Sequence, residues 1–153
     1  MPACSARFAS FSSSDAGKWK LLREGRDAAI VTFGMSVNDA LEAAELLAKA
    51  GVDAAVVKLG RINPLDCSGL MPYLADRHVL VLEENIRTGG IGERIAVAVL
   101  ENGIRIKSLT LKNAGDRFVP QGTRRELMEY CGMDAQSVSD ALIGEVKHGR
   151  ETA

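Results

Sequence analysis

The residues best suited to chemistry lie together in one short stretch. It contains two adjacent carboxylates, a glycine-rich turn and a cation: Glu83, Glu84, Gly89, Gly90, Gly92 and Arg94. A carboxylate can move protons in catalysis, and a glycine turn before a helix can bind an anion through its backbone N–H groups. The stretch is therefore a candidate interface or anion-binding loop.

The two carboxylates are predicted to be structural. Glu83 and Glu84 directly follow the apolar run at residues 79–82, which reads as a strand. Neighbouring residues on a strand point to opposite faces of a sheet, so the pair is not expected to share a proton. We interpret one of them as bracing the glycine turn and the other as meeting a cation across an interface.

The glycine turn matches no standard nucleotide motif. Gly89-Gly90-x-Gly92 fits neither G-x-G-x-x-G nor the P-loop pattern, and no lysine follows it. A tight turn that allows close contact between helix and sheet is the favoured interpretation. Binding of a small anion remains the alternative.

The histidines and cysteines do not form a further site. His78 and His148 have no partner at metal-ligand spacing, and Cys4 is far in sequence from the other cysteines. Cys67 and Cys131 fall near predicted helix ends, where a thiolate is favoured, but neither has a histidine to activate it. We therefore predict no catalytic residue and no metal site in this chain.

Five strands alternating with helices are expected to position the candidate loop. Strands are predicted at residues 18–22, 27–33, 52–59, 79–82 and 106–111, and helices at 36–49, around 70–75, at 95–100, 124–131 and after 134. This order predicts an α/β fold of three α/β/α layers around a mostly parallel sheet. The lysine-bearing run at 18–22 predicts a short antiparallel edge strand, and the less apolar run at 106–111 also predicts an edge position.

Polar residues mark the predicted helix ends. The predicted N-terminal caps are Ser36 with Asp39, Asp66 or Ser68, Thr123 with Glu126, and Asp134. Gly51 and Gly132 lie where left-handed C-terminal caps are expected. The segment Ile95–Leu100 is apolar nearly all round, which predicts contacts beyond the sheet.

Composition limits the classes of partner. The chain has 153 residues, 46% apolar and 25% charged, with a net charge of -1. This charge excludes a broad nucleic-acid surface, and no apolar run reaches the ~20 residues that span a bilayer. We expect a cytoplasmic protein with a lead-in or linker remnant at residues 1–17, one domain at 18–147 and a polar tail at 148–153.

Seven motifs together resemble the C-terminal domain of the transketolase family. They are Arg23–Gly34, Ala40–Ala44, Pro64–Asp66, Glu83–Asn85, Gly89–Gly92, Asn113–Gly122 and Gly132–Ala135. The last two are most similar to the 1-deoxy-D-xylulose-5-phosphate synthases within that family. One departure is Gln121, where those synthases commonly have histidine.

The resemblance implies a part of a larger enzyme. Full members are homodimeric transferases that bind thiamine diphosphate and Mg²⁺ in domains preceding this one. The synthases condense pyruvate with glyceraldehyde 3-phosphate for isoprenoid and thiamine biosynthesis. The G-D-G motif that holds the diphosphate does not occur in this sequence. The implied role is a non-catalytic structural and dimerisation domain that binds no cofactor by itself.

Three alternatives remain at this level. The chain could be the C-terminal subunit of a split transketolase, a stand-alone anion-binding or regulatory module, or the C-terminal part of a 2-oxoacid dehydrogenase beta subunit. The motif Asn113–Phe118 favours a synthase over the dehydrogenase.

Overall fold

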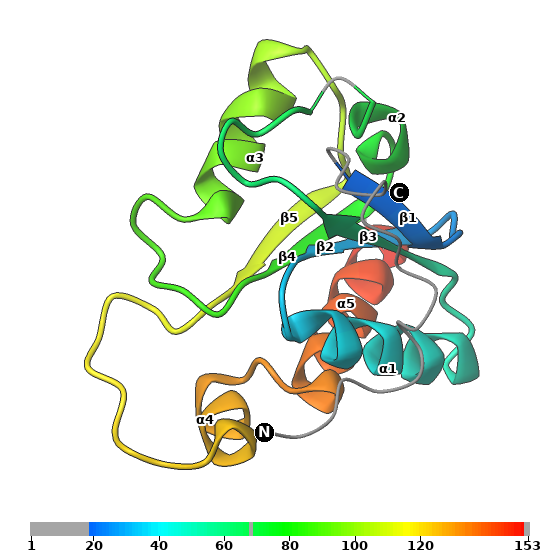
Figure 1. Ribbon diagram of the computed structural model, residues 1–153. Helices are drawn as coiled ribbons and strands as arrows, with labels where there is room; N and C mark the ends of the chain where they lie inside the picture. Colours follow the sequence, from blue (N-terminus) through cyan, green and yellow to red (C-terminus); the bar gives the residue numbers. More distant parts are fainter. Residues whose placement is uncertain (1–18, 68, 152–153) are drawn as a thin grey trace.

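The strands form a single twisted sheet (Figure 1). In the computed structural model, residues 19–67 and 69–151 are described, and the side chains of the last two of these are left aside. The strands are β1 (Trp19–Arg23), β2 (Ala28–Thr32), β3 (Ala54–Leu59), β4 (His78–Leu82) and β5 (Ser108–Lys112), in the spatial order β1-β3-β2-β4-β5. The β2–β3, β2–β4 and β4–β5 pairs are parallel, so the predicted parallel sheet is confirmed.

Helices cover both faces of the sheet (Figure 1). The helices are α1 (Ser36–Lys49), α2 (Met71–Leu74), α3 (Ile91–Glu101), α4 (Arg124–Cys131) and α5 (Ala135–Glu151). Helices α1 and α5 pack on one face, and α2 and α3 lie on the other. This is the predicted α/β/α architecture.

The alternation of strand side chains separates two cores. Ile30, Val56 and Leu80 point toward α1 and α5, whereas Val31 and Val81 point toward α2 and α3. Every residue of β2 and β4 is buried, as continuous apolar runs between two helical layers require. The same alternation carries beyond β4 and sends Glu83 and Glu84 to different faces.

Both predicted edge strands are confirmed. β1 pairs antiparallel with β3, and β5 is the outer strand on the opposite side of the sheet. β5 ends at Lys112, one residue later than predicted, because it pairs in parallel with β4 as far as Leu82. α5 continues to Glu151, so His148 is helical and the predicted polar tail is shorter than expected. The predicted lead-in at residues 1–17 lies outside the described residues.

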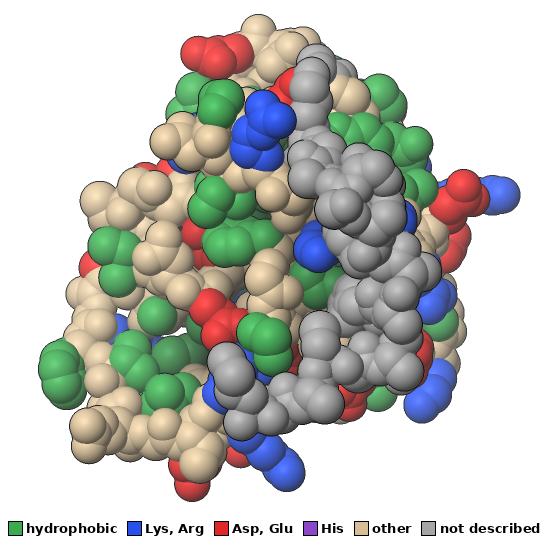
Figure 2. Space-filling view, viewed as in Figure 1, with side chains coloured by type: hydrophobic (Ala, Val, Ile, Leu, Met, Phe, Trp, Pro, Cys, Tyr) green, Lys and Arg blue, Asp and Glu red, His purple; other side chains and the backbone are tan. Residues whose placement is uncertain are grey.

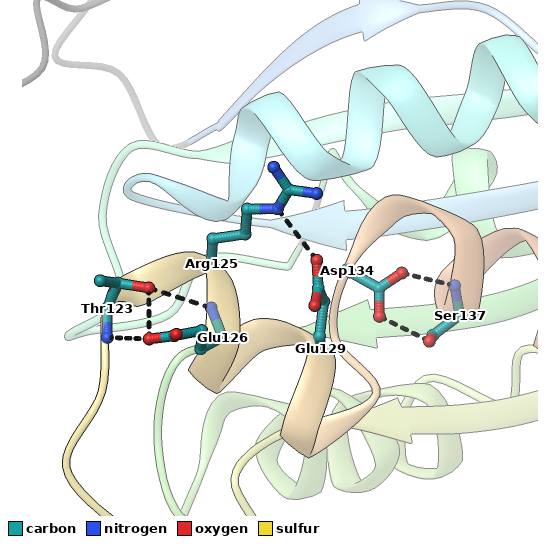
Figure 3. Close-up of polar contacts among 6 residues, drawn as sticks. All are labelled: Thr123, Arg125, Glu126, Glu129, Asp134 and Ser137. Atoms are coloured by element: carbon teal, nitrogen blue, oxygen red, sulfur yellow. Dashed lines mark hydrogen bonds and ion pairs between the residues drawn. The ribbon is translucent and has the colours of Figure 1, made fainter.

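The caps of the last two helices are confirmed (Figure 3). Thr123 accepts a hydrogen bond from the N–H of Glu126, whose carboxylate accepts one from the N–H of Thr123 at 2.8 Å. Asp134 accepts from the N–H of Ser137 at 3.0 Å at the start of α5. The left-handed Gly132 (φ 64°) closes α4 as predicted.

Two predicted caps are wrong. Ser36 is the first residue of α1, after Met35, and its hydroxyl donates to Glu84 at 2.8 Å instead of capping the helix. α2 begins only at Met71 and has no side-chain cap, so Asp66 does not start it. Ser68, the other candidate, lies outside the described residues.

Candidate functional site

Glu83 attaches the start of α3 to the end of β4. The residue is 1% exposed, and its carboxylate accepts hydrogen bonds from the N–H groups of Ile91 (2.8 Å) and Gly92 (3.1 Å). These are among the N–H groups of the first turn that the helix itself leaves without partners. A negative charge at a helix N-terminus is also favoured by the helix dipole. Glu83 therefore acts as a cap supplied from another part of the chain.

This cap explains why α3 begins earlier than predicted. The sequence pattern placed the helix at Ile95–Leu100, but it begins at Ile91, so Gly92 belongs to its first turn and not to the preceding loop. A Cβ on Gly90 would lie 2.6 Å from Glu83 Oε1, and one on Gly92 would lie 2.6 Å from a methyl carbon of Leu111. Both glycines are needed for the close approach of helix, carboxylate and sheet.

A second carboxylate binds another amide of the turn. We use the name glycine loop for residues 85–92, which include the first two residues of α3. The N–H of Gly89 donates to Glu93 at 2.8 Å. With Glu83 bound to Ile91 and Gly92, three N–H groups that could bind an external anion already bind carboxylates of the chain. An incoming phosphate would have to displace these carboxylates and approach their negative charge.

Glu84 joins three elements on the opposite face of the sheet. It accepts a hydrogen bond from Ser36 at the start of α1 and forms an ion pair with Arg124 of α4 at 2.7 Å. Arg124 also binds Asp39 of α1 at 2.7 Å. Partial burial acts to raise the pKa of Glu84, but the hydrogen bonds from Arg124 and Ser36 and the charge of Arg124 outweigh it, so the pKa is lowered.

The loop after β5 is tied to the glycine loop. We call residues 113–122 the arm. Asp116 accepts hydrogen bonds from the N–H (3.0 Å) and the hydroxyl (2.8 Å) of Thr88, and these bonds lower its pKa. The N–H of Ala114 donates to the carbonyl of Asn85 at 2.9 Å. The motif that distinguished the synthases in the sequence therefore braces the candidate loop.

Arg94 does not complete an anion site. Its guanidinium donates to the carbonyl of Ile62 at 2.7 Å. It lines an open hollow of about 570 Å³ beside α3, where Glu93 and Glu101 are also present. Two carboxylates against one guanidinium leave this hollow without a net positive charge to attract an anion.

The cysteines give no reactive thiolate in this region. Burial raises the pKa of Cys67, the charge of Asp66 raises it further, and Arg94 offsets this only in part. Cys67 also lies ahead of α2 and not at its N-terminus. No group of three or more potential metal ligands occurs within residues 19–67 and 69–151.

Sequence reasoning assigned one acid to the glycine turn and the other to a cation across an interface. Glu83 binds the turn, whereas the cation that pairs with Glu84 is Arg124 of the same chain. Ser36 and Asp39 were interpreted as a capping box, yet Ser36 binds Glu84 and Asp39 binds Arg124. One usable signal was present: Arg124 opens a helix close to the carboxyl edge of the sheet, where Glu84 requires a cation. The pairing of Asp116 with Thr88 had no local signal, because 28 residues separate them.

Replacing Glu83 by glutamine tests the internal cap. In Glu83→Gln, one carboxylate oxygen becomes an NH₂ group, so one buried N–H of Ile91 or Gly92 loses its acceptor. We expect the free energy of unfolding, measured by urea denaturation, to fall by about 2 kcal/mol. Glu93→Gln is the matched control at the partly exposed Gly89 contact and should cost less than about 1 kcal/mol. Equal losses in the two variants would contradict this role for Glu83.

Stability should depend on pH through the Glu84–Arg124 pair. The pKa of Glu84 is lower in the folded chain than in the unfolded chain. The ionised Glu84 therefore stabilises the fold at pH values above its unfolded-state pKa, and this stabilisation is lost as the pH falls through its folded-state pKa. We expect Arg124→Gln to reduce the free energy of unfolding at pH 7 by up to ~1 kcal/mol, since solvent screens a half-exposed pair. The difference from wild type should shrink at pH 3.5.

The neighbouring arginine provides the control for this prediction. Arg125 pairs with Glu129 on the surface of α4, and its side chain is 89% exposed. Arg125→Gln should change stability little at either pH, whereas Glu84→Gln should behave like Arg124→Gln. A loss in Arg124→Gln that is the same at pH 7 and pH 3.5 would show that the ion pair is not the cause.

Comparison with known proteins places this fold in a family. Residues 17–138 match the family described as "Transketolase, C-terminal domain". The chain is 35% identical over 127 residues to the 1-deoxy-D-xylulose-5-phosphate synthase of Geobacillus thermodenitrificans. The aligned segment covers 82% of this chain and 20% of that protein. It is 33% identical over 145 residues to the synthase of Syntrophotalea carbinolica, covering 94% of this chain and 23% of that protein.

Solved structures agree on the fold. A protein described as "Split gene transketolase, inactive beta4 tetramer" aligns with 90% of this chain and 46% of its own, at 29% identity and a TM-score of 0.77. A transketolase from Pichia stipitis aligns with 88% of this chain at 18% identity and a TM-score of 0.64, which supports the fold alone. This chain spans about a fifth of the length of the synthases it matches. It belongs to the transketolase C-terminal domain family.

Proposed function

We propose that this chain serves as the non-catalytic C-terminal domain of a thiamine-diphosphate-dependent transferase that makes 1-deoxy-D-xylulose 5-phosphate. In that enzyme the preceding domains, or a separate subunit, bind thiamine diphosphate and Mg²⁺ and condense pyruvate with glyceraldehyde 3-phosphate. The similarity to two bacterial synthases over 82% and 94% of the chain supports this assignment. The domain occupies residues 18–147 in this proposal.

The observation that carries the non-catalytic role is the occupied glycine loop. Its N–H groups at Gly89, Ile91 and Gly92 bind Glu93 and Glu83. A cofactor diphosphate needs free donors and a metal held by oxygen ligands. The Glu83 cap and the Glu84–Arg124 pair both hold structural elements together. The same observation argues against a stand-alone anion-binding module.

A split transketolase subunit is the second candidate. The structural neighbour with a TM-score of 0.77 is described as the product of a split gene. The two candidates share the fold and the non-catalytic role, and they differ in whether the thiamine-binding part is joined to this chain. No helix within the described residues is long and apolar enough to cross a membrane. A cytoplasmic location fits either candidate.

Self-association is proposed to use the outer face of α3. Ile95 and Val99 of this helix are buried against the sheet, but Val97 is 53% exposed and Leu100 is 79% exposed. Apolar side chains exposed together on one helix mark a contact surface. A symmetric pairing of two copies would bury the same patch on each. The structural neighbour of which this chain covers 46% is described as a tetramer.

The purified chain should bind no thiamine diphosphate. Titration calorimetry with thiamine diphosphate and Mg²⁺ should give only heats of dilution, and the chain should not consume pyruvate. The full-length synthase of Geobacillus thermodenitrificans is the positive control. Saturable binding in the micromolar range by this chain would refute the non-catalytic role.

Weak self-association is expected at high concentration. Analytical ultracentrifugation of the chain should show a concentration-dependent dimer, and Val97→Ser combined with Leu100→Ser should weaken it at least about tenfold. Phe118→Ser, which changes an exposed apolar side chain outside α3, is the control and should leave the dimer unchanged. A strictly monomeric wild type, or a double variant that dimerises as well as wild type, would exclude this face as the contact.

A further inference from the structure

Several exposed apolar side chains lie at the end of the sheet where the parallel strands have their carboxyl ends. Met35, Ile62, Ile86 and Phe118 are all exposed. They follow β2, β3, β4 and β5 respectively, within a few residues of each strand's end. Since these four strands are parallel, the four side chains lie beyond the same carboxyl edge. We call them the apolar rim. It is distinct from the α3 face that contains Val97 and Leu100.

The arm is the most prominent part of this edge. In Figure 1 the yellow segment leaves β5, extends away from the sheet and returns at α4. Hydrophobic side chains are visible on the outer side of the same region in Figure 2. Phe118, within the arm, is 91% exposed. A phenylalanine side chain can bury roughly 150 Å² or more, so this position leaves much apolar surface in water.

The arm is held in this extended position by specific contacts. Asp116 binds Thr88 through two hydrogen bonds, and Ala114 binds the carbonyl of Asn85. The guanidinium of Arg117 lies 5.0 Å from the ring centre of Tyr130 on α4. These contacts attach the arm to the glycine loop and to α4 without burying Phe118. A surface already fixed in one conformation loses less entropy when a partner binds.

The path of the chain indicates which partner meets this edge. Trp19, the first residue of β1, pairs with Leu59, the last residue of β3. β1 therefore begins at the carboxyl ends of the parallel strands, on the same side of the sheet as the rim. The synthases that this chain matches are about five times as long as the matched segment, so a large body of protein accompanies this domain in them.

We infer that the apolar rim and the arm are the surface on which the preceding, thiamine-binding part of the enzyme docks. This inference rests on the proposed function and adds the face of the domain that makes the contact. It also assigns two separate roles to two exposed apolar surfaces: the rim contacts the preceding domains, and the outer face of α3 contacts a second copy. The hydrogen bonds between Asp116 and Thr88 then position the arm for this interface.

A chimera tests the inference directly. The whole chain replaces its matching segment in the Geobacillus thermodenitrificans synthase, and amide hydrogen exchange is compared between the chimera and the isolated chain. Amides of residues 84–88 and 113–122 should exchange at least about tenfold more slowly in the chimera, because docking covers them. A chimera that melts in one cooperative transition shows that the domain is docked.

Two outcomes separate this inference from the proposed function. If the domain docks but the arm exchanges as fast as in the isolated chain, the rim is not the docking surface and the proposed function stands. If the domain in the chimera melts independently, at the temperature of the isolated chain, the proposed function fails and the inference fails with it.

A pair of variants gives a second measurement. Phe118→Ser should leave the melting temperature of the isolated chain unchanged, since the side chain is exposed there. In the chimera the same change should increase protease cleavage at the junction at least about tenfold, as expected for loss of a buried aromatic anchor. Leu100→Ser, on the α3 face, is the matched control and should leave cleavage at the wild-type rate. Equal cleavage of the Phe118→Ser and wild-type chimeras would overturn the inference.

Discussion

The carboxylate of Glu83 is the contact on which the carboxyl edge of this domain depends. It lies directly after the fully buried β4 and binds the first two N–H groups of α3. A buried charge is tolerated only where hydrogen bonds compensate its loss of water, and these N–H groups provide them. The contact sets where α3 begins and requires glycine at position 90, while the close approach of Leu111 requires glycine at position 92. The arm is in turn fastened to the loop that this contact shapes.

Periodicity in the sequence predicted most of the fold, and long-range pairing explains what it missed. The apolar runs of β2 and β4 and the capping box at Thr123 are local signals, and the structure confirms them. Ser36 also fitted a local capping pattern, but the carboxylate of Glu84, 48 residues away, takes its hydroxyl. The predicted start of α3 differs from the observed start for the same reason, since the residue that caps this helix lies in another segment. Local sequence patterns cannot predict a hydrogen-bond acceptor that is distant in sequence and becomes adjacent only in the folded chain.

The candidate site illustrates how residues suited to chemistry can be used for architecture. Adjacent acids and a glycine turn at the carboxyl edge of a parallel sheet are typical of ligand sites. Here each acid faces a different core, and each is bound to partners within the chain. The apolar side chains around them remain exposed, and Phe118 is the most exposed of the large hydrophobic residues. Polar groups that are bonded within the chain, beside exposed apolar side chains, fit the docking role that we propose for this end of the sheet.

The central claim is that the chain's own carboxylates occupy the donors of the glycine loop. It is tested most directly by following the backbone amide NMR signals of Gly89, Ile91 and Gly92 while inorganic pyrophosphate is added at constant ionic strength. If Glu83 and Glu93 hold these amides, the three signals should not move beyond the small changes seen across the rest of the chain. Saturable shifts confined to these three amides would show that the loop is an open anion site, and the structural account of this domain would be wrong.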